Sequence, residues 1–336
     1  MGHAMAPPVD PTPILHLVTA YWGSMALFTA NGLGVFTTLA VGPKRADELS
    51  RALGVPERPL QLLLQAAAGL GLLTYENGAF ANTALADTYL VEGRPAFMGN
   101  AIKYGADNYA LWGGLPEVVR TGHSAAGAED YLGRDPERTK RFVWGMHSRA
   151  LGAARGVVQY IDLPSNTTLL DLGGGPGTYS VLLAQKIPNL NAIVFDLSPI
   201  VAIAREIIAS FGLSDRVTVV AGDFTKDSYP APVGAALLSG MLHREPESMC
   251  REIIRKVWEA LQQGGTIVIS DVMLNADKIS PPFSTLFALH MLVCSERGGA
   301  HSKDDQCRWL QDQGFSNVQV RDLPPPGVHT LITGTK

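Results

Sequence analysis

Cysteine is scarce in this chain, and the three cysteines that it has show no paired spacing. Cys250, Cys294 and Cys307 are an odd number, and none of them belongs to a CxxC pattern. We therefore expect neither a disulfide framework nor a metal site. The pattern is typical of buried, unreactive thiols in a reducing compartment, so we expect a cytoplasmic protein.

An excess of positive charge and long apolar runs are also missing. The 336 residues carry a formal net charge of −4, which argues against the basic surface of nucleic-acid-binding proteins. No apolar run approaches the roughly 20 residues that a membrane span needs, and residues 1–5 lack the pattern of a signal peptide. The chain instead has 46% hydrophobic and only 17% charged residues, which suits a globular protein of two domains.

The N-terminal part of the sequence has the pattern of a winged helix. Residues 14–39 indicate one helix that is apolar nearly all round, so another surface must bury it, and a partner subunit is the natural candidate. Short helices are predicted at 44–54 and 59–70, followed by a hairpin through 72–81 with Asn-Gly at its tip. The few basic residues and the apolar second helix argue against DNA recognition.

The remaining sequence changes from helices to alternating strands and helices. Helical segments are predicted at 95–121 and 135–160, with the main domain boundary near 160. The expected strands are 167–172, 192–196, 216–220, 234–239, 266–273, 316–321 and 328–334, and the expected helices between them are 177–187, 198–211, 247–262 and 303–313. This alternation predicts a doubly wound α/β fold with a parallel sheet and a ligand crevice at the carboxyl ends of its strands. The short link before the last strand predicts an antiparallel pair.

The most informative stretch is a glycine-rich turn at 169–177. An apolar run ends in Asp171, and Gly173 and Gly175 follow at alternate positions, where a ligand can approach the backbone closely. The spacing fails the nicotinamide fingerprint, because Thr178 stands where the last glycine belongs. A carboxylate here would repel a pyrophosphate but hold an ammonium group, which S-adenosylmethionine carries at its amino-acid end.

Two further acids end the next two predicted strands. Asp196, followed by Leu197, fits the ribose hydroxyls of the same ligand. Asp223 can accept the adenine amino group, and Phe224 can cover the adenine face. Each acid alone could be a helix cap or a turn residue. Together with the glycine turn, they predict S-adenosylmethionine as cofactor and S-adenosylhomocysteine as its product.

These motifs resemble the class I methyltransferases. More narrowly, they are similar to the plant-type caffeate, isoflavone and acetylserotonin O-methyltransferases and to bacterial relatives that act on pigments and polyketides. The matching pieces are 46–49, 71–73, 171–177, 195–197, 222–224, 241–243 and 314–315. The resemblance covers nearly the whole chain.

The resemblance implies a seven-stranded, mostly parallel sheet and three parts of the chain. These are a winged-helix dimerisation domain at 12–95, a helical connector at 96–160 that contributes to the acceptor pocket, and a cofactor-binding catalytic domain at 161–336. It further implies an interlocked homodimer formed through the N-terminal helices. In that dimer, residues 24–28 of one subunit reach the acceptor pocket of the other.

The same resemblance places the chemistry at His243, in the loop after the fourth strand. A histidine there removes the proton of a phenol, which matters because a phenol of pKa about 10 is ionised in only about one molecule in a thousand at pH 7. Asp271 stands where the family has an acid that orients this base, and His301 stands where the family has a second acid. Ser239 takes a cofactor-contacting position, and 244–245 replace the usual Asp-Trp pair.

In the resembled family, residues on two helices and a tryptophan on an earlier helix build the acceptor pocket. In this chain they are Trp112, Phe142, Met146, His147, His290 and Met291. Ordinary core packing is the alternative for each of them. An apolar pocket with a few polar anchors suits a flat aromatic or polyene acceptor.

The sequence therefore predicts an S-adenosylmethionine-dependent O-methyltransferase of secondary metabolism with His243 as general base. It transfers a methyl group to a hydroxyl of a small aromatic or polyene-type metabolite. The altered residues 244–245, Asp271 and His301 leave methylation of S, N or C, or a reaction without methyl transfer, as an alternative. A metabolite-sensing winged-helix regulator is a third interpretation, which salt-dependent DNA binding would reveal.

Overall fold

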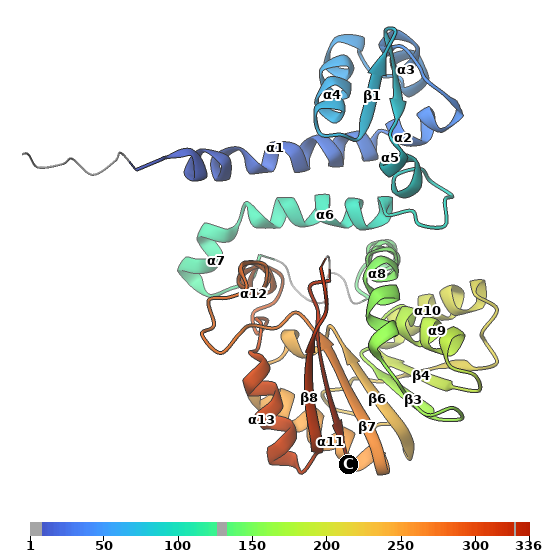
Figure 1. Ribbon diagram of the computed structural model, residues 1–336, viewed down its shortest axis with the longest axis vertical. Helices are drawn as coiled ribbons and strands as arrows, with labels where there is room; N and C mark the ends of the chain where they lie inside the picture. The colour runs from blue at the N-terminus through green and yellow to red at the C-terminus, as the bar shows by residue number, and fades with distance from the viewer. Residues whose placement is uncertain (1–8, 126–132, 326) are drawn as a thin grey trace, which may run out of the picture. The chain divides into compact units, whose positions relative to one another are not determined.

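The computed structural model describes residues 9–125, 133–325 and 327–336. The chain forms two compact units, residues 1–106 and 107–336, and Figure 1 shows the elements of both. The predicted division into 12–95, 96–160 and 161–336 remains a prediction.

The N-terminal unit begins with two helices where the sequence predicts one. Helix α1 runs over Thr12–Gly32 and α2 over Val35–Thr38, so the single helix predicted at 14–39 is wrong. Gly34 lies between them with a φ of 76°. A residue in this left-handed conformation ends a helix, and glycine adopts it without strain.

The winged-helix pattern is confirmed in the rest of this unit. After η1 (Leu39–Val41), helices α3 (Ala46–Leu53) and α4 (Glu57–Gly69) precede strands β1 (Leu73–Glu76) and β2 (Ala79–Asn82), and α5 (Ala84–Tyr89) follows. The two strands are antiparallel. Asn77 and Gly78 at their tip both have positive φ, 51° and 82°, as the tight hairpin turn requires. Leu49, Leu64 and Phe80 are buried in the core of the unit.

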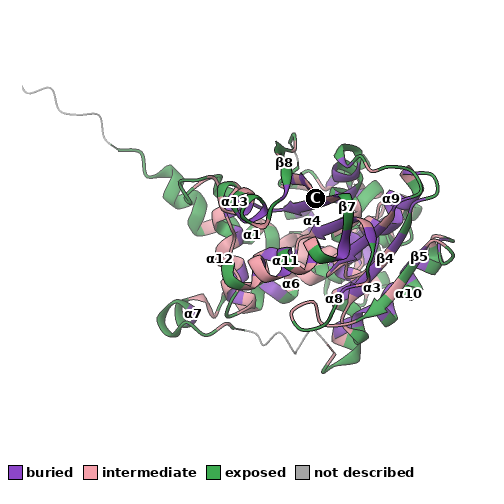
Figure 2. Cartoon of the chain, turned by 90° about the horizontal axis from the view of Figure 1, so that it is seen from below, coloured by how far each residue is buried: buried purple, intermediate pink, exposed green. Residues whose placement is uncertain are grey.

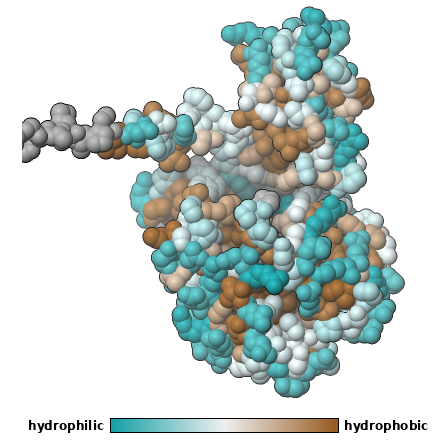
Figure 3. Space-filling model, viewed as in Figure 1, coloured by the Kyte–Doolittle hydropathy of each residue, from teal (hydrophilic) through white to brown (hydrophobic). Residues whose placement is uncertain are grey.

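The first half of α1 exposes a set of large apolar side chains. Ile14, Leu15, Leu17, Val18 and Trp22 have between 58% and 77% of their surface exposed, and Figures 2 and 3 show this helix as exposed and partly apolar. No single helix among the described residues is long and apolar enough to span a membrane. Only α1 taken together with residues 35–41, at a bend of 53°, passes that test by length and composition.

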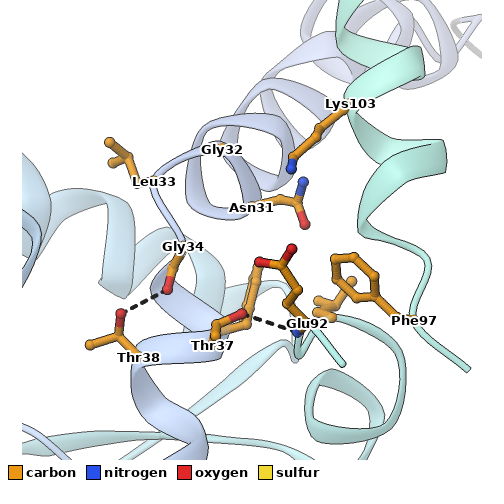
Figure 4. A pocket seen from close by; sticks show the side chains of 11 residues that line it. Asn31, Gly32, Leu33, Gly34, Thr37, Thr38, Glu92, Phe97 and Lys103 are labelled. Carbon is orange, nitrogen blue, oxygen red and sulfur yellow. Dashed lines mark hydrogen bonds between the residues drawn. The ribbon is translucent and has the colours of Figure 1, made fainter. Parts of the chain in front are cut away.

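A small polar pocket of the N-terminal unit lies where α1 passes into α2 (Figure 4). Several of its polar groups are already paired. The Asn31 amide donates to the Gly99 carbonyl at 3.2 Å, and the Thr37 hydroxyl accepts the Glu92 N–H at 3.1 Å. These bonds fasten the turn around Gly34 to the segment after α5.

Three helices confirm the helical segments predicted at 95–121 and 135–160. They are α6 (Gly99–Trp112), α7 (Leu115–Thr121) and α8 (Pro136–Val157), and η3 (Val158–Tyr160) follows α8. Gly113 and Gly114 separate α6 from α7, because two successive glycines weaken a helix. Asp135 caps α8 by accepting the N–H groups of Glu137 and Arg138.

The C-terminal unit is built on the predicted seven-stranded sheet. Its strands are β3 (Thr168–Leu172), β4 (Asn191–Asp196), β5 (Val217–Ala221), β6 (Val233–Ser239), β7 (Leu261–Asp271), β8 (Ser316–Asp322) and β9 (Thr330–Thr335), in the order β5-β4-β3-β6-β7-β9-β8. Strands β3 to β7 are parallel, and β9 is antiparallel to β7 and β8. The doubly wound fold and the antiparallel pair are therefore confirmed.

Helices cover both faces of the sheet (Figure 1). They are α9 (Thr178–Lys186), α10 (Ser198–Ser210), α11 (Glu247–Ala260) and α13 (Lys303–Gln313), while α12 (Pro282–Cys294) lies beyond the strand ends and contacts α7. One buried cluster joins the sheet to α11 and α13, and a second joins it to α8, α9 and α10. The strands β4 and β7 are drawn as buried in Figure 2. The loops at the carboxyl ends of β3, β4, β6 and β7 meet at one edge, which becomes the candidate site.

The cysteines follow the sequence prediction only in part. All three are free thiols. Cys250 is fully buried, whereas Cys294 and Cys307 are only partly buried, so the prediction of buried thiols is wrong for these two. Burial raises the pKa of the Cys294 and Cys307 thiols, which keeps them protonated and weakly nucleophilic near neutral pH.

Candidate active site

The glycine-rich turn leaves an open approach to the backbone at the end of β3. Gly173 and Gly175 have positive φ, 64° and 53°, which an L-residue with a side chain rarely adopts. A Cβ on Gly173 would lie 3.3 Å from Met241, while a Cβ on Gly175 would meet nothing within 4 Å among the described atoms. Gly173 is therefore needed for packing, and the space at Gly175 is free for a ligand.

Asp171 is a buried carboxylate with one unused oxygen. It is 1% exposed, and its Oδ2 accepts the Ser180 hydroxyl at 2.6 Å. Its Oδ1 is buried and has no hydrogen-bond partner among the described residues. Burial raises the pKa of Asp171 to about 6, and the nearby Asp196 charge adds to that rise. A cation placed against Oδ1 would satisfy this oxygen and favour the ionised form.

Asp196 joins the end of β4 to the glycine turn. Its Oδ2 accepts the Gly175 N–H at 2.8 Å, and its Oδ1 accepts the Leu197 N–H at 2.7 Å. Burial raises the pKa of Asp196, although these two N–H groups oppose the rise. A carboxylate offers about four lone-pair positions, so Asp196 can also accept two hydroxyls.

Asp223 and Phe224 follow β5, as predicted, but Asp223 already has several partners. It accepts the Thr225 hydroxyl at 2.6 Å and pairs with Lys226 at 2.8 Å. Burial alone would raise the pKa of Asp223, but Lys226 and Thr225 outweigh it and lower that pKa. The Phe224 ring lies 3.6 Å from a Cβ built on Gly173, and so it borders the glycine turn.

His243 and Asp271 form a buried pair at the ends of β6 and β7. His243 Nδ1 and Asp271 Oδ1 are 2.7 Å apart, and their side chains are 12% and 3% exposed. Burial by itself would raise the pKa of Asp271, but the charge and hydrogen bond of His243 outweigh it and hold that pKa below its ordinary value. An ionised carboxylate can only accept, so Nδ1 carries the proton and Nε2 is left as the basic atom.

The imidazole of His243 is also fixed from the side. The Phe287 ring of α12 meets it edge to face, with 4.8 Å between ring centroids. The side chain of Asp271 therefore reaches His243, and an aromatic ring limits the rotation of the imidazole. His301 contacts the same turn differently, because its Nε2 lies against the carbonyls of Leu242 and Glu245 at 3.2 Å and 2.9 Å.

Comparison with known proteins fits this arrangement of a glycine turn, four acids and a histidine. Residues 112–316 match the O-methyltransferase domain family, and residues 15–92 match the O-methyltransferase dimerisation domain. The chain belongs to the class I S-adenosylmethionine-dependent O-methyltransferases. The predicted family, fold and cofactor are thus confirmed.

Two relatives and one solved structure illustrate the range of this similarity. The methyltransferase is 33% identical over 330 residues to the 3-hydroxy-5-methyl-1-naphthoate 3-O-methyltransferase of Streptomyces sahachiroi, covering 97% of this chain and 95% of that protein. It is 30% identical over 278 residues to the N,N-dimethyltransferase OxyT of Streptomyces rimosus, covering 80% of each. Human N-acetylserotonin methyltransferase in complex with S-adenosylmethionine superposes with a TM-score of 0.87 at 25% identity, covering 99% of each chain.

The residues of the methyltransferase fit this cofactor on three structural grounds. Asp171 Oδ1 is a buried acceptor with no hydrogen-bond partner among the described residues. The space at Gly175 admits the ligand, and Asp196 keeps lone pairs for hydroxyls after bonding two backbone N–H groups.

The raised pKa of Asp171 predicts a pH-dependent cofactor affinity. The contact that we propose between Asp171 and the cofactor ammonium needs the ionised carboxylate, and below a pKa of about 6 a proton must first leave Asp171. The Kd for S-adenosylhomocysteine should therefore be flat above about pH 7 and rise up to about tenfold per pH unit below about pH 6. Isothermal titration calorimetry at pH values on both sides of this pKa measures the Kd for S-adenosylhomocysteine. The Asp171→Asn variant, which cannot ionise, should show a flatter profile, and equal affinity of the native enzyme at both ends would contradict the prediction.

Trp112, His290 and Met291 lie together beside the base. Trp112 Nε1 donates to His290 Nδ1 at 3.0 Å, and the two rings are stacked at an interplanar angle of 7°. Burial lowers the pKa of His290, so its ring is neutral and Nε2 carries the hydrogen. Met291 is buried in one cluster with Phe287, the ring that contacts His243. Three of the predicted acceptor residues are thus brought together.

The residues predicted on α8 have other neighbours. His147 lies 2.8 Å from the Thr178 hydroxyl at the start of α9, and burial lowers the pKa of this histidine to about 4. Phe142 packs against the cluster of α10 residues. Met146 is half-buried on the same helix. For His147 and Phe142 these contacts are those of core residues, the alternative that the sequence left open.

The sequence did not reveal two further polar residues at this edge of the sheet. His329 Nδ1 lies 2.9 Å from the Ser270 hydroxyl. In the sequence His329 directly precedes Thr330, which is the register partner of Asp271 between strands β9 and β7. The Tyr179 hydroxyl bonds the side chains of Ser239 and Ser270, and burial raises the pKa of Tyr179. Only the register of β9 on β7 brings His329 here, and that register is not visible in the sequence.

Proposed function

We propose that this enzyme transfers a methyl group from S-adenosylmethionine to a hydroxyl of a small aromatic or polyene-type metabolite, with His243 as general base. The observation that carries the proposal is the 2.7 Å hydrogen bond between His243 Nδ1 and Asp271 Oδ1. It orients the imidazole and leaves Nε2 as a proton acceptor.

The proposed chemistry needs little more than alignment and proton removal. The bound cofactor supplies an electrophilic methyl group. His243 Nε2 takes the proton of the acceptor hydroxyl, and Asp271 stays ionised because its pKa is held low, which stabilises the imidazolium. A positioned base of this kind is worth about 10²–10⁴-fold in rate.

We assign the cofactor to the residues at the strand ends. Asp171 holds the ammonium group, Asp196 with Leu197 holds the ribose, and Asp223 with Phe224 faces the adenine. Gly173 and Gly175 give room for the ligand, and Ser239 borders the same space. The support for these roles is the unpaired oxygen of Asp171 and the free lone pairs of Asp196.

The acceptor is proposed to bind against the Trp112–His290 pair and Met291. Because His290 Nδ1 accepts from Trp112, its Nε2–H is a donor, and the partner recorded for it is the Cys294 sulfur at 3.8 Å, which is a weak acceptor that a ligand oxygen can replace. A donor beside flat apolar walls favours an aromatic ring that carries a carbonyl or ether oxygen near the reacting hydroxyl. The related naphthoate methyltransferase acts on such a ring system.

Methylation of nitrogen is the second candidate. The relative OxyT is an N,N-dimethyltransferase, and a neutral amine needs less help from a base than a phenol does. Residues 244–245 and His301 also depart from the family pattern.

The test is turnover of a panel of naphthols, hydroxynaphthoates, hydroxylated polyenes and matched aromatic amines. Formation of S-adenosylhomocysteine measures methyl transfer, and mass spectrometry with NMR identifies the methylated atom. An O-methyl product supports the proposal. An N-methyl product alone would replace it by the second candidate, and cofactor binding without turnover of any member would contradict both.

We further propose that two copies of the chain pair through α1 and work in a reducing, cytoplasmic compartment. The support is the match to the dimerisation domain, the exposed apolar side chains of α1 and the three free thiols. Light scattering should give twice the chain mass of 35.9 kDa. Leu17→Asp, at 77% exposure, should shift the enzyme toward monomer, while Val41→Asp, at 83% exposure, serves as the control. A stable monomer of the native chain would contradict the pairing.

A further inference from the structure

We propose that His301 is a positioning residue that holds the turn carrying His243 in place. This inference rests on the proposed role of His243 as the base. His301 stands where the resembled family has a second acid, yet its contacts are with the backbone of the turn. It therefore acts on the base through the main chain.

The contacts identify His301 as a hydrogen-bond donor. Its Nε2 lies 2.9 Å from the Glu245 carbonyl and 3.2 Å from the Leu242 carbonyl. A carbonyl oxygen can only accept, so Nε2 must carry a hydrogen in both the neutral and the charged ring.

These two carbonyls lie in and directly after the turn that carries His243. The turn η4 (Leu242–Arg244) is too short to pair its own last carbonyls. The Leu242 carbonyl accepts the Glu245 N–H at 3.0 Å, and it also has the Cys250 thiol as a donor at 3.3 Å. Apart from His301, the donor recorded near the Glu245 carbonyl is the Cys250 thiol at 3.5 Å, and a thiol is a weak donor. The Glu245 carbonyl is therefore the one that depends more on His301.

His301 is itself held rigidly. Its ring meets the Trp309 ring edge to face at 4.9 Å between centroids, and Trp309 is 2% exposed. The His301 carbonyl accepts the Leu274 N–H at 3.0 Å, three residues after Asp271. A side chain fixed by packing and hydrogen bonds can hold its neighbours within the tolerance that catalysis needs.

The same segment ties the base to its partner acid. The Gly299 N–H donates to the His243 carbonyl at 2.8 Å, and the Leu274 carbonyl accepts the Lys303 N–H at 2.9 Å. Residues 299–303 therefore bond both the turn that carries His243 and the loop that follows Asp271. Loss of the His301 donor would let the turn relax and lengthen the His243–Asp271 bond.

Three substitutions separate this role from a side-chain contact with the base. His301→Phe keeps the ring but removes the donor, and it should lower kcat about 10–100-fold, because misplacing a reacting group by about 1 Å costs up to 10²-fold. His301→Gln restores an N–H donor and should recover kcat to within about fivefold of the native value. His301→Glu points a carboxylate at two carbonyls and should be no better than His301→Phe.

Other readouts distinguish positioning from loss of folding or of proton transfer. The KM for the acceptor and the Kd for S-adenosylhomocysteine should change less than about threefold. The acid limb of the kcat/KM profile should stay at the same pH, since Nε2 is not a proton relay. The downfield NMR signal of the His243 Nδ1 proton should weaken in His301→Phe and return in His301→Gln. His123→Ala, whose side chain is 78% exposed, is the control.

An unchanged kcat in His301→Phe would overturn the proposal, and so would a loss of the acid limb. High activity of His301→Glu would also overturn it, because it would show that an acid contacting the imidazole is what the position requires. Failure of the proposed function looks different. In that case the native enzyme forms no S-adenosylhomocysteine, or His243→Ala keeps its rate.

Discussion

Replacing His243 by alanine is expected to lower kcat by about 10²–10⁴-fold while the affinity for S-adenosylhomocysteine stays within about threefold. The imidazole is held by Asp271 at 2.7 Å and by the edge of Phe287, so its Nε2 is oriented for the acceptor proton. The cofactor contacts assigned above involve other residues. Steady-state kinetics and calorimetry on the same preparation measure the two quantities.

The acidity of the acceptor provides an internal control for this prediction. An acceptor phenol with a pKa of about 7 is already half ionised at neutral pH, so it needs the base much less. The loss of kcat in His243→Ala should then shrink to about tenfold or less. The Asp271→Asn variant should lose less than His243→Ala, since it misorients the base without removing it. Equal losses for acceptors of high and low pKa would show that His243 does not take the proton.

The second large effect is expected from Asp196→Ala, which should raise the Kd for S-adenosylhomocysteine about 100-fold or more. Asp196 accepts the N–H groups of Gly175 and Leu197, and in our proposal it also accepts the ribose hydroxyls. Its removal leaves two backbone donors unpaired and loosens the glycine turn. A 100-fold change corresponds to about 2.7 kcal/mol, which is reasonable for several lost charge-assisted hydrogen bonds.

Calorimetry at neutral pH measures this effect directly. Asp215→Ala is the matched control, because Asp215 is an exposed acid between α10 and β5. The thermal midpoint without cofactor should fall much less than cofactor affinity does. If Asp196→Ala binds S-adenosylhomocysteine as tightly as the native enzyme, the ribose assignment is wrong.

The strands and their acids were predictable because local patterns fix them. Mostly apolar strands of five or six residues, each ending in or followed by an acid or a glycine, form β3, β4 and β5. Parallel strands bring their carboxyl ends to one edge, so Asp171 and Asp196 had to lie near each other. The break of the first helix was not predicted, because Gly34 sits in an otherwise helical pattern and its left-handed conformation depends on the packing around it.

The neighbours of the helical residues were less predictable than the strand ends. Sequence spacing cannot tell which helix face meets the pocket, and so His147 was grouped with His290 although it contacts Thr178. The bond between Trp112 and His290 joins residues 178 positions apart. His301 stands where the resembled family has a second acid, yet its donor is aimed at main-chain oxygens, which no sequence pattern indicates.

The apolar side chains of α1 have a consequence for mixtures of active and inactive copies. All the residues assigned to the cofactor lie between 171 and 239, whereas the exposed leucines and tryptophan lie near residues 14–22 of the other unit. Under the proposed pairing, a copy with an inactive catalytic centre still captures a normal copy. Co-production of both forms would therefore produce mixed pairs, each with one intact catalytic centre.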